Sequence, residues 1–188
     1  QSTLLLHDAV AILHTSADGI WYWVETNDGA GWVKSTDVAF CTTHNQWLAA
    51  QEPTHFLIVT AASLPLNIAN TTTDLVDLTL TMGTKLPLVS TVGNVDGRKP
   101  YGNYVIQVPT RNSAGYLVYQ QALVPVSQDV SEGYLPYTRE QLLQQAFKWQ
   151  GYYYGANGSC LEGNSATFIR DIFRTFGIQL PGNATNLM

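Results

Sequence analysis

The chain has 188 residues, of which 45% are hydrophobic and 12% are charged, so it can bury a core and is not expected to be disordered. Its formal net charge of −5 comes without a basic block, which argues against nucleic acid as a partner. No apolar stretch approaches the roughly 20 residues needed to cross a bilayer, so no membrane span is expected.

The first part of the chain is predicted to form β structure. Residues 10–14 are a short apolar strand, and residues 21–26 are a second strand of aromatic and β-branched side chains. A turn at 27–29 leads to a third short strand at 31–33. The tail at 37–39 closes this unit.

A similar order of features returns later in the chain. A strand at 86–90 and a polar loop precede an aromatic strand at 102–108, a turn at 111–113, a Gly-aromatic strand at 115–118 and a tail at 122–125. The repeat predicts two small β-barrels in tandem, over residues 1–52 and 53–127. The pattern resembles the bacterial SH3-like (SH3b) domain, whose closing Gly-Trp-Val signature stands at 31–33. That resemblance implies generic binding modules.

The pattern becomes helical after residues 128–137, which have turn residues without a clear period and are predicted to be a linker. Thr138 and Gln141 have the spacing of a capping box. The helix they begin places Leu142, Leu143, Ala146 and Phe147 on one face and stops at Gly151. A second helix is expected from about Ser165, with Gly177 as its stop and an apolar stripe of Phe168, Ile169, Ile172, Phe173 and Phe176.

The stretch from Tyr152 to Pro181 resembles the NlpC/P60 family of cell-wall cysteine peptidases. In that family an aromatic pair precedes a Gly-rich loop, and Asp-Cys-Ser then begins a helix. The helix aligns without a gap from Phe168 through Pro181, so Asn164, Ser165 and Ala166 fall on the family's Asp, Cys and Ser. The implied fold is an α+β multidomain protein, in which two SH3-like barrels precede the helical N-terminal half of a papain-like domain at 138–188.

The resemblance implies roles for five residues. Ser165 takes the position of the nucleophile, Tyr152 and Tyr154 match the aromatic positions beside it, and Asn164 and Ala166 fall in the substrate-binding part of the motif. Two simpler interpretations stay open, since the tyrosines can be packing residues and Asn164 is a good helix N-cap.

A helix start favours a thiol over a hydroxyl as the nucleophile. Its unpaired N–H groups and positive dipole end lower the pKa of a cysteine, and they can also stabilise an oxyanion. A serine ionises far above neutral pH and needs a general base. His7, His14, His44 and His55 all lie in the β region and are interpreted as structural. With Ser165, the site is therefore predicted to be inactive.

The two cysteines, Cys41 and Cys160, form no metal-ligand pattern, and no cofactor or metal is expected. A disulfide in an oxidising compartment stays open, but two unpaired thiols are favoured, with Cys41 buried. Cys160 stands five residues before Ser165, in the loop, so it does not match the nucleophile position.

The family resemblance implies a bacterial hydrolase of peptidoglycan stem peptides or muropeptides, cutting next to D-glutamate and a diamino acid. Its place would be the cell envelope, periplasmic or secreted. The alternative is a non-catalytic relative that binds cell-wall peptide or a protein through its SH3-like domains. Two helices without a sheet leave an apolar face exposed. We therefore expect the missing sheet to come from residues outside this sequence or from another chain.

Overall fold

The structure is a computed structural model that describes residues 4–27, 29–66, 78–90, 93–95, 97–152 and 165–180. Within these ranges the fold is mixed α/β, with several small sheets and three α-helices. None of the described helices is long and apolar enough to cross a membrane.

The N-terminal sheet consists of β1 (Ala11–Thr15), β2 (Trp21–Thr26) and β3 (Gly29–Lys34), in that order and antiparallel. These are the three strands predicted from the first part of the sequence. Val24 on β2 is 1% exposed, whereas the cross-strand partner pair Trp23 and Trp32 lies on the opposite face with ring centroids 5.4 Å apart. The alternation of strand residues accounts for this division.

A short 3₁₀ turn, η1 (Ser35–Asp37), and a helix, α1 (His44–Gln51), follow this sheet. The prediction that residues 1–127 are entirely β structure is therefore wrong at α1. Thr43 caps the helix, because its side chain accepts a hydrogen bond from the Gln46 N–H at 3.1 Å. The spacing of Thr43 and Gln46 is that of a capping box, a sequence signal for this helix.

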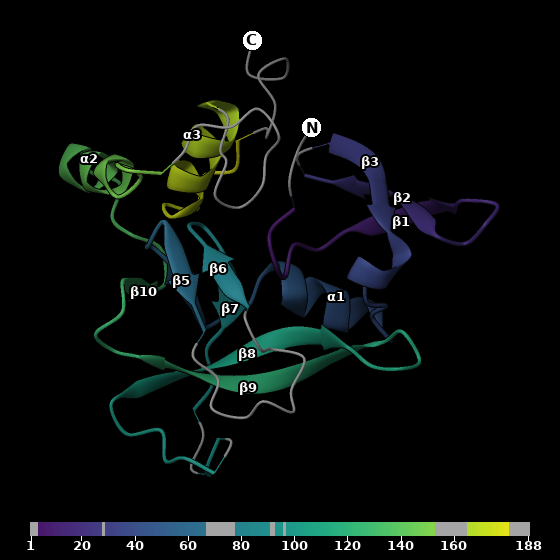
Figure 1. The fold of residues 1–188 in the computed structure, drawn as a ribbon, viewed down its shortest axis with the longest axis horizontal. Coiled ribbons are helices and arrows are strands. Elements are labelled where there is room, and N and C mark those ends of the chain that lie inside the picture. Colours follow the sequence, from purple (N-terminus) through teal and green to yellow (C-terminus); the bar gives the residue numbers. More distant parts are fainter. Residues whose placement is uncertain are drawn as a thin grey trace.

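The middle of the molecule is built from short antiparallel strands and one long hairpin. The short strands are β4 (Phe56–Val59), β5 (Ser63–Pro65), β6 (Thr79–Thr81), β7 (Lys85–Pro87) and β10 (Val130–Glu132). They pair as β10-β4-β7 and as β5-β6. The hairpin joins β8 (Asn103–Arg111) to β9 (Leu117–Pro125) and runs along one side of the molecule (Figure 1).

The main hydrophobic core lies between these strands. It consists of Leu57, Val59, Leu64, Leu66, Leu80, Leu86, Ile106, Val108, Ala122 and Val124, all at most 6% exposed. Both strands of the hairpin and four of the short strands contribute to it, so these pieces form one packed body.

The prediction of two closed barrels is not confirmed, because the described strands form four separate sheets and none of them closes. The two predicted units are also joined, since Phe40 forms an isolated parallel bridge with Tyr116, the residue just before β9. The segment 128–137, predicted as a linker, contains β10, which pairs with β4 from Val130 to Glu132. A strand of three residues is too short to show a period in the sequence.

Two helices follow β10, α2 (Arg139–Phe147) and α3 (Ser165–Arg174), and Figure 1 places them side by side above β5 and β6. Thr138 is confirmed as the N-cap of α2, since the Gln141 N–H donates to its hydroxyl at 3.2 Å, which is one of the two hydrogen bonds of the predicted capping box. The predicted apolar face of α2 is only half buried, because Leu143 and Phe147 are 45% and 68% exposed.

The predicted apolar stripe points inward at Ile172 of α3 and at Phe176 in the turn just after it, which are 4% and 8% exposed. Ile169 differs, at 38% exposed. The helix is also covered on a second side, where Arg170 and Asp171 are 0% and 3% exposed. The simple expectation of one apolar and one polar face therefore does not describe α3.

Candidate functional site

The candidate site centres on the start of α3. Ser165 is its first residue and is exposed, whereas the next residue, Ala166, is 4% exposed and packs inward. A group at the first position of a helix lies beside the unpaired N–H groups of the first turn. Of the other predicted site residues, Tyr154 and Asn164 lie outside the described residues.

Tyr152, the remaining predicted site residue, stands just after the turn that follows α2 and is 40% exposed. Its ring meets that of Trp149 edge-on at 5.9 Å, and Trp149 meets Phe168 of α3 edge-on at 6.0 Å. Trp149 is fixed in turn by its indole N–H, which donates to the sulfur of Met82 at 3.2 Å. Tyr152 is thus connected to α3 through Trp149, an arrangement that fits both a site role and simple packing.

A small cluster of buried side chains holds α3 in place. Met82, Ile172 and Phe176 form its centre, and Leu142, Trp149 and Phe168 are among the half-buried residues that surround it. Met82 comes directly after β6, so the cluster anchors the helix to the strands as well as to α2. The start of α3 is therefore supported by packing from two neighbouring elements.

A buried ion pair lies within α3. The guanidinium of Arg170 contacts Asp171 through Nε and Nη2, both 2.8 Å from Oδ1. Burial nevertheless raises the pKa of Asp171 to about 6, against the opposing effect of Arg170. This carboxyl is consequently near its titration range under mildly acidic conditions.

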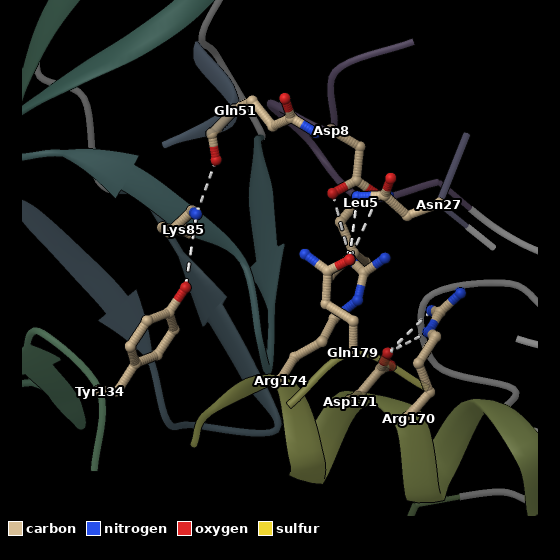
Figure 2. A network of polar contacts seen from close by, with 10 residues as sticks. All are labelled: Leu5, Asp8, Asn27, Gln51, Lys85, Tyr134, Arg170, Asp171, Arg174 and Gln179. Atoms are coloured by element: carbon tan, nitrogen blue, oxygen red, sulfur yellow. Dashed lines mark hydrogen bonds and ion pairs between the residues drawn. The ribbon is translucent and has the colours of Figure 1, made fainter. Parts of the chain in front are cut away.

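The C-terminal end of α3 is tied to the N-terminal strap, by which we mean residues 4–10. Arg174 Nη1 donates to both carboxylate oxygens of Asp8, at 3.1 and 3.2 Å (Figure 2). The Leu5 N–H donates to Asp8 Oδ2 at 2.9 Å and orients that carboxylate. Gly83 allows the close approach, since a Cβ there would lie 2.9 Å from the Cβ of Arg174.

Three further contacts complete the polar network of Figure 2. Asn27 Nδ2 donates to Gln179 Oε1 at 2.9 Å, joining the end of β2 to the segment after α3. Lys85 Nζ donates to the backbone oxygen of Gln51 at 2.8 Å and to the hydroxyl of Tyr134 at 3.4 Å. The network encloses a cavity of only about 80 Å³, so it is a packed polar interface rather than a ligand site.

The contacts of three histidines agree with their structural interpretation. His7 Nε2 lies 2.9 Å from the hydroxyl of Tyr119, His14 meets Trp32 edge-on, and His44 stacks on Trp47. None of these partners belongs to α3. Burial lowers the pKa of His7 to about 4, which keeps this side chain neutral at pH 7.

Cys41 is half-buried rather than buried as predicted, and it is a free thiol whose pKa is raised by burial. It therefore lacks the lowered pKa of a reactive cysteine. Cys160 lies outside the described residues. Within the described ranges, no cluster of three or more His, Cys, Asp or Glu side chains could hold a metal ion.

Sequence reasoning missed the polar residues that support the candidate site. Asp8 and Arg174 are 166 positions apart, and no local pattern connects them. Arg170 and Asp171 did carry a signal, because both charged residues lie next to positions of the apolar stripe on a short helix.

Comparison with known proteins shows a similarity of the N-terminal sequence to SH3 domains and a similarity of the fold to a solved structure. A family of SH3 domains (SH3b1 type) matches residues 1–34. Comparison with curated protein sequences gave no significant match. Six solved chains match the structure. One is a novel NlpC/P60 endopeptidase from Photobacterium damselae subsp. piscicida, with a TM-score of 0.72 and 18% identity. The match covers 94% of this chain but only 35% of that protein, so the present chain spans about a third of its length.

Proposed function

We propose that this chain is part of a peptidoglycan stem-peptide hydrolase of the NlpC/P60 type, with serine in the place of the nucleophilic cysteine. The observation that carries the proposal is the position of Ser165 as the exposed first residue of α3. The similarity in fold to an NlpC/P60 endopeptidase and the SH3 match at residues 1–34 support it.

The chemistry of the position explains what a cysteine would do there. The N–H groups and dipole of the first turn of α3 would stabilise a thiolate at residue 165, and the thiolate would attack the carbonyl carbon of the scissile peptide bond. Backbone N–H groups at the same helix start would hold the oxyanion that forms. Serine gains too little from this field to ionise, so the chain with Ser165 binds substrate without cleaving it.

The substrate in this proposal is a stem peptide of the bacterial cell wall, cleaved next to D-glutamate and a diamino acid. Asn164 would flank the substrate, and Tyr152 and Tyr154 would lie beside the nucleophile. Ala166, predicted from the motif to contact substrate, packs inward and would act through the backbone of the helix start. The protein would act in the cell envelope, as a periplasmic or secreted enzyme, with SH3-like domains holding the wall. The exposed Leu143 and Phe147 of α2 would pack against a further sheet, supplied by other residues of the polypeptide or by another chain.

The test is the Ser165→Cys variant of the complete native polypeptide, assayed for release of peptides from muropeptides. We expect activity in this variant and none in the serine form. Ser127→Cys introduces the same thiol at an exposed position outside α3 and is the matched control. Sequencing the native gene gives a second test. Serine encoded at position 165, without a histidine downstream, would refute the proposal.

One observation favours a second function, a non-catalytic binding protein of the cell wall. Residues 164, 165 and 166 all depart from the family's motif, whereas the apolar stripe of α3 is intact and its Ile172 and Phe176 are buried. Loss of chemistry with retention of the fold is what a binding relative would show. The same assay separates the two functions, because a remnant site would stay inactive in the Ser165→Cys variant.

A further inference from the structure

A second candidate site lies away from the start of α3. A groove of about 810 Å³ runs between the N-terminal strap, the segment from η1 to Cys41, α1 and the turn end of the β8–β9 hairpin. This volume falls in the range of about 300–1,000 Å³ that is typical of ligand sites. It is also about ten times that of the polar cavity beside Arg174.

The lining of the groove is largely apolar and held in place. Val38, Phe40, Trp47 and Leu117 contribute to it. The indole N–H of Trp47 donates to the backbone oxygen of Val10 at 3.1 Å, which fixes α1 against the strap. The imidazole of His44 stacks on Trp47 at 6.0 Å with an interplanar angle of 16°. The groove is therefore a formed surface before any ligand arrives.

Two stretches of backbone in the groove offer hydrogen-bonding groups. Ala9 and Ala39 both line it, and both are half-buried and outside regular structure. In the part of the chain that the structure describes, neither the N–H nor the C=O of these two residues makes a hydrogen bond. Backbone groups that no protein group engages are available to a ligand, and an extended peptide laid beside them can supply both donors and acceptors.

An exposed cation, Arg111, lies at the hairpin end of the groove. Arg111 is the last residue of β8, and its guanidinium lies so close to Gly115 that a Cβ there would be 3.0 Å from Nη2. The φ of +90° at Gly115 also favours glycine at this position. No hydrogen bond or ion pair engages the Arg111 side chain within the described residues. A planar guanidinium binds a carboxylate well, because two parallel N–H···O bonds can form.

We propose that this groove binds a short extended peptide that carries a carboxylate. The peptide backbone pairs with Ala9 and Ala39, its apolar side chains rest against Phe40 and Trp47, and its carboxylate meets Arg111. The groove contains no residue of α3, so peptide binding there does not depend on the role of Ser165.

The experiment titrates the 188-residue chain with acetyl-Ala-Glu-Ala-amide and follows backbone and indole N–H signals by NMR. We expect shifts at Ala9, Ala39 and the Trp47 indole, and an affinity about fivefold higher than for acetyl-Ala-Gln-Ala-amide. Arg111→Gln should remove the preference for the glutamate peptide. Arg98→Gln, the same change at an exposed arginine outside the groove, should keep it.

A third peptide tests the backbone pairing. Methylation of the amide nitrogens of acetyl-Ala-Glu-Ala-amide removes its main-chain donors and should lower the affinity for the wild-type chain at least about threefold. The proposal is overturned if the wild-type chain shows no shifts, or shifts only elsewhere. Equal binding of the glutamate and glutamine peptides, or an unchanged preference in Arg111→Gln, also overturns it. So does a concentration-dependent shift of the same signals without peptide, because the groove would then be occupied by a second copy.

Discussion

The buried carboxyl of Asp171 gives a direct test of how α3 is packed. Burial raises its pKa from 3.8 to about 6, although Arg170 lies 2.8 Å away. The folded protein therefore holds this proton more tightly than the unfolded chain does, and the contribution of Asp171 to the free energy of unfolding falls as the pH rises from about 4 to about 6. A pKa change of this size corresponds to about 3 kcal/mol.

The Asp171→Asn variant removes this titration while keeping the size and shape of the side chain. The free energy of unfolding of the variant minus that of the wild type should increase by about 3 kcal/mol between pH 4 and pH 7. This increase does not depend on the size of the difference at pH 4. Urea unfolding followed by tryptophan fluorescence measures this. His7 titrates in both proteins, so its contribution cancels in the comparison.

Asp18→Asn is a control of opposite sign. The hydroxyl of Ser16, followed by the Ile20 N–H, lowers the pKa of Asp18, so the stability that its carboxylate contributes is lost as the pH falls below about 4. The Asp18→Asn variant should therefore be less stable than the wild type at pH 7 and approach it in acid. A pH-independent difference for Asp171→Asn, or one with the slope of Asp18→Asn, would refute the reasoning about α3.

Three more predictions concern stability. Because burial lowers the pKa of His7 from 6.5 to about 4, this residue alone should reduce the free energy of unfolding by up to about 3 kcal/mol as the pH falls through this range, which opposes the contribution of Asp171. Relative to the wild type, His7→Asn should therefore gain up to about 3 kcal/mol in free energy of unfolding between pH 7 and pH 4, as measured by urea unfolding at the two pH values. Asparagine tolerates the positive φ at this position. Met82→Ala should lower the free energy of unfolding by about 2–5 kcal/mol, because Met82 is 0% exposed at the centre of the α3 cluster. A decrease of less than about 1 kcal/mol in urea unfolding at pH 7 would contradict this packing. Thr138→Ala should lower the free energy of unfolding by about 1 kcal/mol, because α2 loses its N-cap. An unchanged midpoint of thermal unfolding would contradict this role of Thr138.

Local features of the fold could be predicted from the sequence because neighbouring residues determine them. The β1–β3 strands follow from alternating aromatic and β-branched residues, and the cap of α2 follows from Thr138 and Gln141. The inward positions of Ile172 and Phe176 follow from helical periodicity. The helix α1 was predictable from Thr43 and Gln46 by the same rule, but a run of predicted strands on both sides concealed it.

Features that depend on distant contacts could not be predicted in this way. Strand β10 forms because Val130–Glu132 pairs with the edge of β4. A segment of three residues carries no sequence pattern that would predict this pairing. Leu143 and Phe147 satisfy the helical pattern as well as Leu142 does, yet only the contacts of the folded chain decide which of them is covered. Gln145 is 2% exposed for the same reason, at a position that the pattern assigns to solvent.

The N-terminal strap explains how the segment with the SH3 match and the helix with the candidate site become parts of one structure. His7 adopts a left-handed φ of 73°, and its ring meets Tyr119 on β9, while the next residue, Asp8, pairs with Arg174 on α3. A strained backbone conformation costs about 1–3 kcal/mol and persists where surrounding contacts require it. The same strap lines the proposed peptide groove through Ala9 and Val10. Residues 1–34 alone would lack both Tyr119 and Arg174, so neither the groove nor the support of α3 is expected in that fragment.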